Sequence, residues 1–297
     1  MTTEQGAFWS KVSETRGGLE RVIAAHLAEW DDAHVERAIY GSDDPAVIAG
    51  TIETFCRAEL GASVARPLFY RSSVGAVAGL ELHDGRRVVV KGHQPDWART
   101  RLAEIVRLQR HLAARGLLAP EVLAGPSVLG SGLAVVESYV DRGGLPDAHE
   151  PEVRRALATA LHSVIEALQP FTGASMLPSQ LMTAQSLGAL WPAPHSRLFD
   201  FDATRAGAED IDRLASAARA RMTPAGAIVL GHGDWRVEHV RFEGAHPVAA
   251  FDWDSLCRDR EPASTARCGH ALGADERRQP GTFQHLVATH GDDLLAL

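Results

Sequence analysis

The chain concentrates its strand-like pattern in one block and surrounds that block with helical patterns. Between residues 66 and 92, β-branched and aromatic residues form short runs, and Asp84-Gly85 supplies a strong hairpin signal. Residues 1–60 and 97–116 instead space their apolar residues by three and four positions, which predicts helices. Strands and helices segregated along a chain are typical of an α+β protein, and we expect that fold class here.

Local signals mark where several helices begin and end. Asp43-Asp44-Pro45 is a favourable helix start, because an acidic capping residue precedes a proline in the first turn. Gly116 is expected to end the helix at 97–116. Pro151 suits the first turn of a long amphipathic helix at 151–168.

The second half of the chain is expected to be mainly helical. Residues 132–140 predict a strand, 208–222 predict a helix, and 227–253 predict a strand–loop–strand unit, which is a short hairpin. We therefore expect two lobes. Residues 1–140 would hold the N-terminal helices and a small antiparallel sheet, and residues 141–297 would form a mainly helical lobe.

Composition and charge exclude several functional classes. The 297 residues carry a formal net charge of −8 and a pI near 5.9, which argues against a binder of nucleic acid or anionic membranes. No basic segment followed by an apolar core opens the sequence, and no run of about 18 apolar residues occurs. The three cysteines, without metal-type spacing, fit reduced thiols. We expect a cytoplasmic protein with no nucleic-acid or membrane partner, and the oligomeric state is not indicated.

A short loop near residue 234 carries the clearest chemical pattern. The apolar run at 227–230 leads into His232-Gly233-Asp234, and His239 follows five residues after Asp234. A carboxylate placed after a strand and beside a glycine can accept a proton from a hydroxyl, and it also suits a turn-capping role. His232 taken alone fits a buried histidine bonded to the backbone.

A second apolar strand ends at Asp252, two residues before Asp254. The period of two along a strand predicts that both carboxylates point to the same side. Asp252 and His239 would then flank one divalent cation, Mg²⁺ or Mn²⁺, and leave Asp234 available to meet an acceptor. Asp254 also fits the N-cap of a following helix.

Upstream, Lys91 closes the strand-like run "RRVVVK". Its ammonium can pair with nucleotide phosphates, and Glu104 in the next predicted helix is the natural carboxylate to hold it. A strand-end lysine that reaches solvent beside a solvated glutamate explains the same pattern. In the preceding turn, Ser72, Ser73 and Gly75 can present backbone N–H groups to phosphate, or they form an ordinary serine–glycine turn.

These parts follow the order of a kinase active site: a turn, a strand lysine, a helix glutamate, a linker strand, a His-Gly-Asp triplet and a strand aspartate. Over about residues 60–260 the chain resembles the aminoglycoside phosphotransferase-like branch of the protein-kinase-like superfamily, which includes the choline kinases. The motifs that carry the resemblance are "GHGDWRVEH" and "AAFDWDSL", with "VVVKG" upstream. The resemblance implies a two-lobed protein-kinase-like fold. A small antiparallel-sheet N-lobe within 1–140 would bind nucleotide, and a mainly helical C-lobe at 141–297 would hold the catalytic and acceptor-binding residues.

The resemblance implies roles for the downstream residues. Asp234 would be the catalytic base, and Arg236 matches a position where related enzymes often carry a basic residue. Asp252 would bind the metal ion. The family pattern has Asn where this chain has His239, and an imidazole suits transition metals better than Mg²⁺. His239 would therefore ligate Mn²⁺ or another ion, hold only one metal loosely, or mark weakened catalysis. Few residues follow Asp252, so the acceptor pocket would be shallow or completed by a partner.

The resemblance also implies a nucleotide site, for ATP or GTP. Lys91 would contact the α- and β-phosphates and pair with Glu104. The strand at 135–140 would be the hinge, with backbone groups around Glu137, Ser138 and Tyr139 meeting the adenine.

The expected reaction is transfer of the γ-phosphate to a hydroxyl of a small molecule, with an aminoglycoside or another amino-bearing compound as candidate acceptor. The region 172–212 and the tail would line its pocket. Carboxylates there can bind a cationic group or cover a solvated helix face. These acidic residues are Asp200, Asp202, Glu209, Asp210, Asp212, Asp292 and Asp293.

Two other functions stay open from the sequence. One is a Zn²⁺- or Mn²⁺-dependent hydrolase, in which Lys91 and the serine–glycine turn would have no role. Its ligand set would be His232, Asp234, His239, His246 and Asp252. The other is a catalytically weak nucleotide-binding protein, which His239 suggests.

Overall fold

The computed structural model describes residues 18–30, 32–173, 175, 177–179, 190–191, 205–221 and 226–260. By their internal contacts, the residues group into two compact units. The first holds the residues up to Arg110 and Pro120–Val140, and the second holds His111–Ala119 and the residues from Asp141 onward. The short segment His111–Ala119 thus packs with the chain's second half. The functional division expected at residue 140 stays a prediction.

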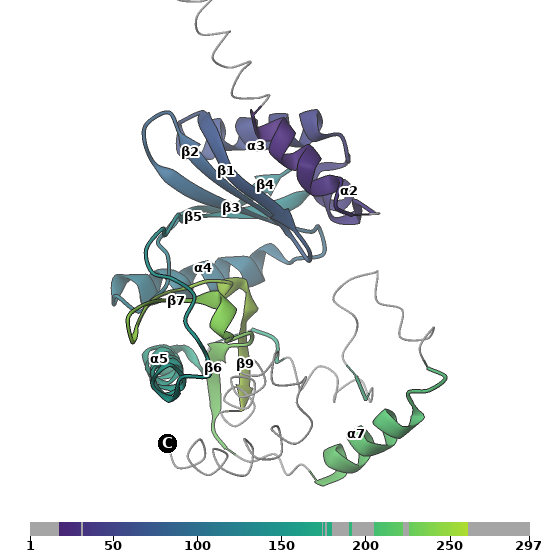
Figure 1. Cartoon of the computed structure of the whole chain (residues 1–297), viewed down its shortest axis with the longest axis vertical. Helices are drawn as coiled ribbons and strands as arrows, with labels where there is room; N and C mark the ends of the chain where they lie inside the picture. Colours follow the sequence, from purple (N-terminus) through teal and green to yellow (C-terminus); the bar gives the residue numbers. More distant parts are fainter. Residues whose placement is uncertain are drawn as a thin grey trace, which may run out of the picture. The chain divides into compact units, whose positions relative to one another are not determined.

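A five-stranded antiparallel sheet forms the centre of the first unit (Figure 1). The strands lie in the order β1-β2-β3-β5-β4, and each neighbouring pair is antiparallel. Their bounds are β1 Val64–Ser72, β2 Ala76–Leu82, β3 Arg87–His93, β4 Val122–Leu129 and β5 Gly132–Ser138. The hairpin predicted at Asp84-Gly85 is confirmed, because β2 and β3 pair on either side of it and Gly85 adopts a φ of 86°.

Strand β4 was not among the predicted strands. Gly125 and Pro126 interrupt its pattern and are residues typical of a turn. The structure accommodates the proline because β4 lies at the edge of the sheet, where one side of the backbone needs no strand partner.

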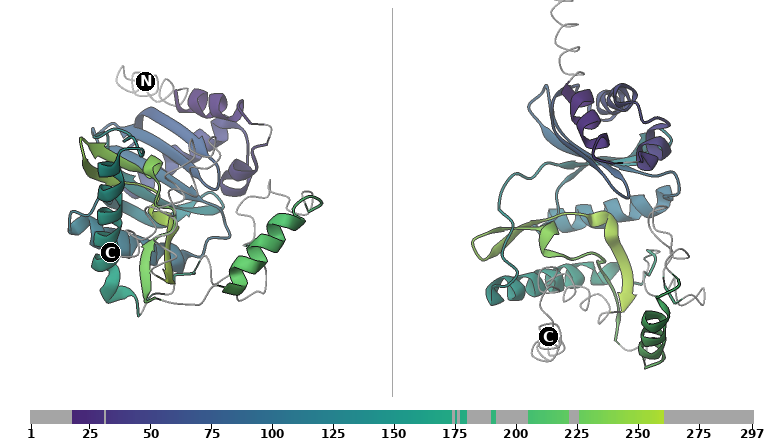
Figure 2. Two further views of the ribbon diagram at one scale, coloured as in Figure 1. Left: turned by 60° about the horizontal axis from the view of Figure 1, so that its bottom comes forward. Right: turned by 45° about the vertical axis from the view of Figure 1, so that its right-hand side comes forward.

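Helices cover both faces of this sheet (Figures 1 and 2). A helix at residues 18–27, α2 (His34–Tyr40) and α3 (Pro45–Leu60) pack on one face and bury the main apolar core. Helix α4 (Arg99–Ala114) lies against the other face, where its Val106 packs with Val122 and Val135.

The predicted signals for the start of α3 and the end of α4 are confirmed. The side chain of Asp44 accepts a hydrogen bond from Ala46 N at 2.9 Å and caps α3, with Pro45 as the first helical residue. Gly116 adopts a left-handed φ of 71° just after α4 and donates its N–H to Ala113 O.

The second unit contains α5 (Pro151–Leu168), which packs against two small antiparallel sheets. One sheet pairs β6 (Ile228–His232) with β9 (Leu256–Arg260), and the other pairs β7 (Val240–Glu243) with β8 (His246–Ala250). Helix α7 (Glu209–Arg221) and the short 3₁₀ turns η1 (Gln169–Phe171), η2 (Val237–His239) and η3 (Trp253–Ser255) complete the described elements.

The predicted single hairpin over 227–253 is wrong in its pairing. Strand β6 pairs with β9, which lies beyond the predicted unit at 227–253, and the β7/β8 hairpin is inserted between them. The periodicity of a strand shows that it is extended but not which strand it pairs with, so this pairing was beyond the sequence pattern. The α+β class is confirmed. Among the described helices, none combines the length and apolar character needed to cross a membrane.

Candidate active site

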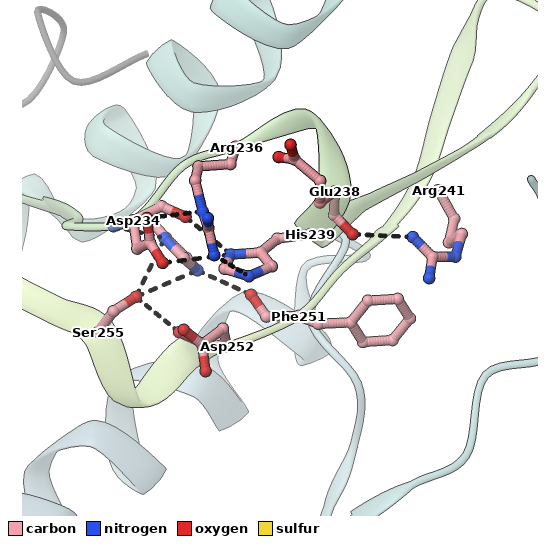
Figure 3. A network of polar contacts seen from close by, with 9 residues as sticks. Asp234, Arg236, Glu238, His239, Arg241, Phe251, Asp252 and Ser255 are labelled. Atoms are coloured by element: carbon pink, nitrogen blue, oxygen red, sulfur yellow. Dashed lines mark hydrogen bonds and ion pairs between the residues drawn. The ribbon is translucent and has the colours of Figure 1, made fainter. Parts of the chain in front are cut away.

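Two strand ladders bring a loop and a strand end together in the second unit. At one end His232 pairs with Leu256 across β6 and β9, and at the other Val240 pairs with Ala250 across β7 and β8. Next to the second ladder, Phe251 N–H donates to His239 O at 2.9 Å. The residues just beyond these ladders therefore converge, as Figure 3 shows.

The convergence produces a group able to bind a metal ion. Asp234, His239 and Asp252 each offer one ligand atom, and these atoms all lie within 4.8 Å of one another. Two carboxylates and one imidazole suit a divalent cation: the oxygens favour Mg²⁺, and the ring nitrogen adds affinity for Mn²⁺ and later transition metals. All three side chains are partly exposed, so an ion or a phosphate has access to them.

Hydrogen bonds define the protonation of His239 (Figure 3). Its Nδ1 lies 2.9 Å from Asp234 O, and its Nε2 lies 3.0 Å from a guanidinium nitrogen of Arg236. A carbonyl oxygen only accepts and a guanidinium only donates, so the proton is on Nδ1 and the lone pair is on Nε2. Nε2 is therefore the nitrogen with which His239 would ligate a metal.

Arg236 joins two members of the group. Its Nε lies 2.9 Å from Asp234 Oδ1 while its other nitrogen meets His239 Nε2. The guanidinium is 44% exposed and the Asp234 side chain 40% exposed, so this ion pair contributes little to stability. It places a positive charge directly beside the carboxylate.

The predicted geometry of Asp252 and Asp254 is wrong. Strand β8 ends at Ala250, and Asp252 adopts a left-handed φ of 66°, so the strand period no longer governs the direction of its side chain. Ser255 Oγ–H donates to Asp252 O at 2.6 Å and holds this turn. Asp252 occupies the N-cap position of η3, and Asp254 lies within η3 instead of capping it.

His232 is the buried, backbone-bonded histidine that its pattern suggested. The ring is fully buried, its Nε2 donates to Phe251 O at 2.8 Å, and its Nδ1 accepts from Asp234 N at 3.2 Å. Burial lowers the pKa of His232 to about 4, because water no longer solvates the charged form. Both nitrogens are thus engaged, and Trp235 and Trp253 pack edge-on against the ring.

The ligand set of the hydrolase alternative is therefore not assembled. His232 uses its nitrogens on the backbone, and His246 lies exposed on β8 at the far end of the β7/β8 hairpin. Within the described ranges, the group with metal-ligand geometry is Asp234, His239 and Asp252.

In the first unit, Lys91 lies on the face of the sheet that α4 covers. It pairs with Val135 across β3 and β5, and Val135 packs against Val106 of α4. The side chain is 7% exposed. Glu104 projects from the same helix, and its carboxylate lies 3.7 Å from the guanidinium of Arg107. Lys91 is thus buried, which argues against a lysine that simply reaches solvent, and its phosphate role stays a prediction.

The predicted phosphate turn is held by contacts within the chain. Ser72 N–H donates to the imidazole of His26 at 3.0 Å, and Ser73 N–H donates to Gly75 O at 3.0 Å. Gly75 is needed sterically, because a Cβ there would lie 2.5 Å from Gly92 O. In this conformation the N–H groups of Ser72 and Ser73 are engaged within the protein, so the predicted phosphate contacts of this turn remain to be tested.

The predicted hinge is also well ordered by internal bonds. Ser138 N–H donates to Glu121 O at 2.8 Å, and Tyr139 N–H donates to Arg87 O at 3.0 Å. The carboxylate of Glu137 is buried and accepts from Gln109 Nε2 at 2.9 Å. The adenine contacts proposed for this strand stay a prediction.

The acidic residues that fall on α7 have local structural roles. Glu209 accepts from Gly207 N at 2.8 Å, Asp210 pairs with Arg213 at 2.7 Å, and Asp212 accepts from Trp191 Nε1 at 2.7 Å. Acidic residues in the first turn of a helix also interact favourably with its dipole. The remaining candidates for an acidic acceptor surface, Asp200, Asp202, Asp292 and Asp293, lie outside the described residues.

Two buried polar residues near the predicted nucleotide residues were missed. His26 bonds to Ser72, and Gln109 bonds to Glu137 and, at 3.2 Å, to Pro120 O. Each is one buried polar side chain among the several polar residues of an amphipathic helix. Its partner lies far away in the sequence, so no local spacing singles it out.

A protein-family model described as the phosphotransferase enzyme family matches residues 80–259. That span is more than half of the chain and runs from β2 to β9, so it contains Lys91, the Asp234 loop and Asp252. A comparison with curated protein sequences gives no match.

Several solved structures share the fold. The aminoglycoside-3'-phosphotransferase of type VIII aligns with a TM-score of 0.53 at 17% identity, over 83% of this chain and 92% of its own. Macrolide 2'-phosphotransferase MphH from Brachybacterium faecium gives 0.52 at 18% identity, over 82% of each chain. Amicoumacin kinase hAmiN, in complex with AMP-PNP, Ca²⁺ and Ami, gives 0.53 at 11% identity, over 74% of this chain and 70% of its own. These likenesses confirm the predicted two-lobed protein-kinase-like fold.

Proposed function

We propose that this chain, which belongs to the phosphotransferase enzyme family, transfers the γ-phosphate of ATP, or of GTP, to a hydroxyl group of a small molecule. The observation that carries this proposal is the convergence of Asp234, His239 and Asp252 at the ends of two strand ladders. Phosphoryl transfer requires little covalent chemistry from a protein. It requires a positioned acceptor and positive charge near the phosphates: Asp234 would position the acceptor, and a divalent cation held by the three side chains would supply the charge.

Asp234 is the proposed catalytic base. Its carboxylate is 40% exposed, so an acceptor hydroxyl can approach it within hydrogen-bond distance. Its backbone is fixed on both sides, because Asp234 N–H donates to His232 and Asp234 O accepts from His239. The carboxylate is thereby presented from a rigid loop and accepts the proton that the hydroxyl loses on transfer.

Arg236 is the proposed phosphate contact in this loop. A guanidinium carries several donors in a planar fork and is always charged, which suits the oxygens of a transferring phosphoryl group. In the structure this fork bridges Asp234 and His239. A rotation of the Arg236 side chain would bring the same donors to a phosphate bound beside the Asp234 carboxylate.

The residues also fit a divalent cation, with Asp252, His239 Nε2 and Asp234 as the side chains that would hold it. When bound, Mg²⁺ or Mn²⁺ would neutralise charge on the phosphates. Lys91 is proposed for the α- and β-phosphates with Glu104 as its partner. The turn with Ser72, Ser73 and Gly75 is also proposed to meet phosphate, and the strand around Glu137, Ser138 and Tyr139 is proposed to meet the adenine.

The acceptor is proposed to be a hydroxylated compound that carries an amino group. The formal net charge of −8 favours a cationic ligand. The names of three proteins of similar fold specify an aminoglycoside, a macrolide and amicoumacin, which supports a small-molecule acceptor. The carboxylates of α7 add little support, because each has a partner within the protein.

The test has two steps. A thermal-shift titration with ATP and GTP, each with Mg²⁺ or Mn²⁺, is expected to raise the unfolding midpoint in a metal-dependent way. Transfer from the preferred nucleotide to a panel of amino-bearing alcohols is then followed by mass spectrometry. A midpoint that responds to Zn²⁺ or Mn²⁺ alone, and to no nucleotide, would favour a metal-dependent hydrolase instead.

The variant Asp234→Asn tests the base. Transfer is expected to fall about 100-fold or more, because an amide cannot accept the proton, while nucleotide affinity stays within about twofold. Asp147→Asn is the matched control, since Asp147 lies in the same unit and its side chain accepts from His149 N. Asp234→Asn with near wild-type turnover would show that another group is the base. Nucleotide binding without transfer to any acceptor would favour the weak nucleotide-binding alternative.

A further inference from the structure

A buried histidine in the N-terminal helix holds the start of the serine–glycine turn. His26 lies near the end of the helix at 18–27 and is 2% exposed. Its Nε2 lies 3.0 Å from Ser72 N and 2.9 Å from Ser72 Oγ. The two residues are 46 positions apart, so this contact ties the N-terminal helix to the last residue of β1.

The donors decide the state of the ring. Ser72 N–H can only donate, so His26 Nε2 carries the lone pair and the neutral ring carries its proton on Nδ1. Burial holds the pKa of His26 below its ordinary value, which favours this neutral form. Nδ1 is buried and has no hydrogen-bond partner among the described residues.

The buried Nδ1–H of His26 lowers the stability of the folded state. An unsatisfied buried donor loses its hydration without replacement, and an apolar ring would avoid the loss. The surroundings would accept such a ring, because His26 packs edge-on against Tyr70 at 5.5 Å and lies 6.1 Å from Trp30. Packing alone therefore does not account for a histidine here, and the bonds to Ser72 are what its polar edge contributes.

The rest of the turn is fixed as well. Gln94 Nε2 donates to Val74 O at 2.7 Å, and Gly75 approaches Gly92 so closely that no Cβ would fit. Beneath the end of β1, Tyr70 OH donates to the buried carboxylate of Glu36 on α2. The turn is thus anchored at its start by His26, at its tip by Gln94 and at its end by Gly92.

We propose that His26 is a positioning residue for nucleotide binding, which acts through Ser72 to hold the turn at 72–75 in one conformation. His26 is buried beneath the turn and would not touch the nucleotide itself. The inference rests on the proposed function, since the turn is proposed there to meet phosphate. It makes the N-terminal helix, which lies outside the span matched by the family model, part of the nucleotide-binding machinery.

The test compares three single variants with the wild-type protein. His26→Phe keeps a ring of similar shape but removes the acceptor. His26→Gln places a carbonyl oxygen the same number of bonds from Cβ as Nε2, so it can accept from Ser72 N–H again. Ile23→Ala is the matched control, because Ile23 is fully buried in the same helix and its truncation weakens the core without altering the Ser72 contact.

Two readouts are taken at a temperature where all variants are folded: hydrogen exchange of the peptide spanning 71–76, and the dissociation constant of Mg·ATP by calorimetry. His26→Phe is expected to exchange faster in that peptide and to weaken Mg·ATP binding about tenfold, because the turn loses its anchor and is no longer preorganised for the nucleotide. His26→Gln is expected to stay within about twofold of wild type. Ile23→Ala should lower the unfolding midpoint while both readouts stay unchanged.

Several outcomes would overturn the inference. These are unchanged exchange and affinity in His26→Phe, no rescue by His26→Gln, or equal losses in Ile23→Ala, which would make His26 an ordinary core residue. Hydrogen exchange separates this failure from that of the proposed function. If the wild-type protein binds no nucleotide while His26→Phe still loosens the turn, the anchoring holds, but the phosphate role falls together with the proposed function.

Discussion

The imidazole of His239 uses both nitrogens to organise its loop. Nδ1–H fixes the backbone of Asp234, and Nε2 accepts from Arg236. An asparagine side chain can also donate one hydrogen bond and offer one acceptor, but its acceptor is an oxygen. The exchange of Asn for His therefore preserves the hydrogen-bonding pattern while changing the hardness of the metal ligand.

His239→Asn is therefore expected to change the metal preference of this group. Binding of Mg²⁺ with ATP should be retained or strengthened, and the preference for Mn²⁺ over Mg²⁺ should fall by about tenfold, because an oxygen ligand replaces a nitrogen. Calorimetric titration of each metal into the protein with ATP measures both constants. His246→Asn is the control, since His246 is exposed on β8 outside the group. Loss of Mg²⁺ binding with an intact fold would show that the imidazole has a role that an amide cannot fill.

His232 predicts a pH dependence of stability. Its pKa is about 4 in the folded protein against an ordinary value of 6.5, so between these values the unfolded chain binds a proton that the folded protein does not. Acid therefore favours unfolding, and stability present above about pH 6.5 is lost as the pH falls toward 4. Between pH 7 and pH 5 this one group should remove about 2 kcal/mol from the free energy of unfolding.

Urea unfolding at the two pH values measures this loss. The variant His232→Gln is expected to be less stable at pH 7 but to lose less stability on acidification than the wild-type protein. His26, whose pKa is also lowered, contributes in the same direction and leaves a residual dependence. His162→Gln is the control, because that imidazole is 54% exposed. An equal pH dependence in His232→Gln and wild type would refute the assignment to His232.

At the scale of elements, the β1–β2 turn shows how close contact constrains a sequence. A Cβ on Gly75 would lie 2.5 Å from Gly92 O, and a backbone oxygen cannot move aside as a flexible side chain can. Gly75→Ala is therefore expected to destabilise the protein by about 1–3 kcal/mol. Gly173→Ala, where no atom lies within 4 Å of the added Cβ, should change stability much less. Thermal unfolding of both variants checks the contrast, and equal midpoints would contradict it.

The elements predicted correctly are those with local causes. The Asp44 cap, the Asp84-Gly85 hairpin, the Gly116 helix end and the Pro151 helix start each depend on residues within one turn. The β6/β9 pairing has no such local cause, because the β7/β8 hairpin separates its strands. The predicted direction of the Asp252 side chain was also wrong, because the left-handed backbone at this residue ends the strand period.

At the scale of the whole chain, the segment His111–Ala119 shows that chain order and spatial grouping differ. It lies between residues of the first unit in sequence but packs with the second, where Leu118 O accepts from Ala250 N and His111 contacts the ring of Phe171 at 4.8 Å. A boundary drawn at one residue cannot describe such an excursion. The order of the motifs along the chain nevertheless indicated the family, because that order does not depend on how the segments pack.

The sequence by itself determined the α+β class, most helix ends and the chemical types at the site: a carboxylate after a His-Gly pair, a histidine five residues on, and a second carboxylate after an apolar strand. The spacing of apolar residues and helix capping act over a few residues, so they can be recognised from the sequence. Only the tertiary structure decided that these three ligand atoms lie within 4.8 Å of one another, that Phe251 O is the partner of His232, and that His26 reaches Ser72. Such contacts join residues far apart in the chain, and they depend on which strands pair and which side chains are buried together.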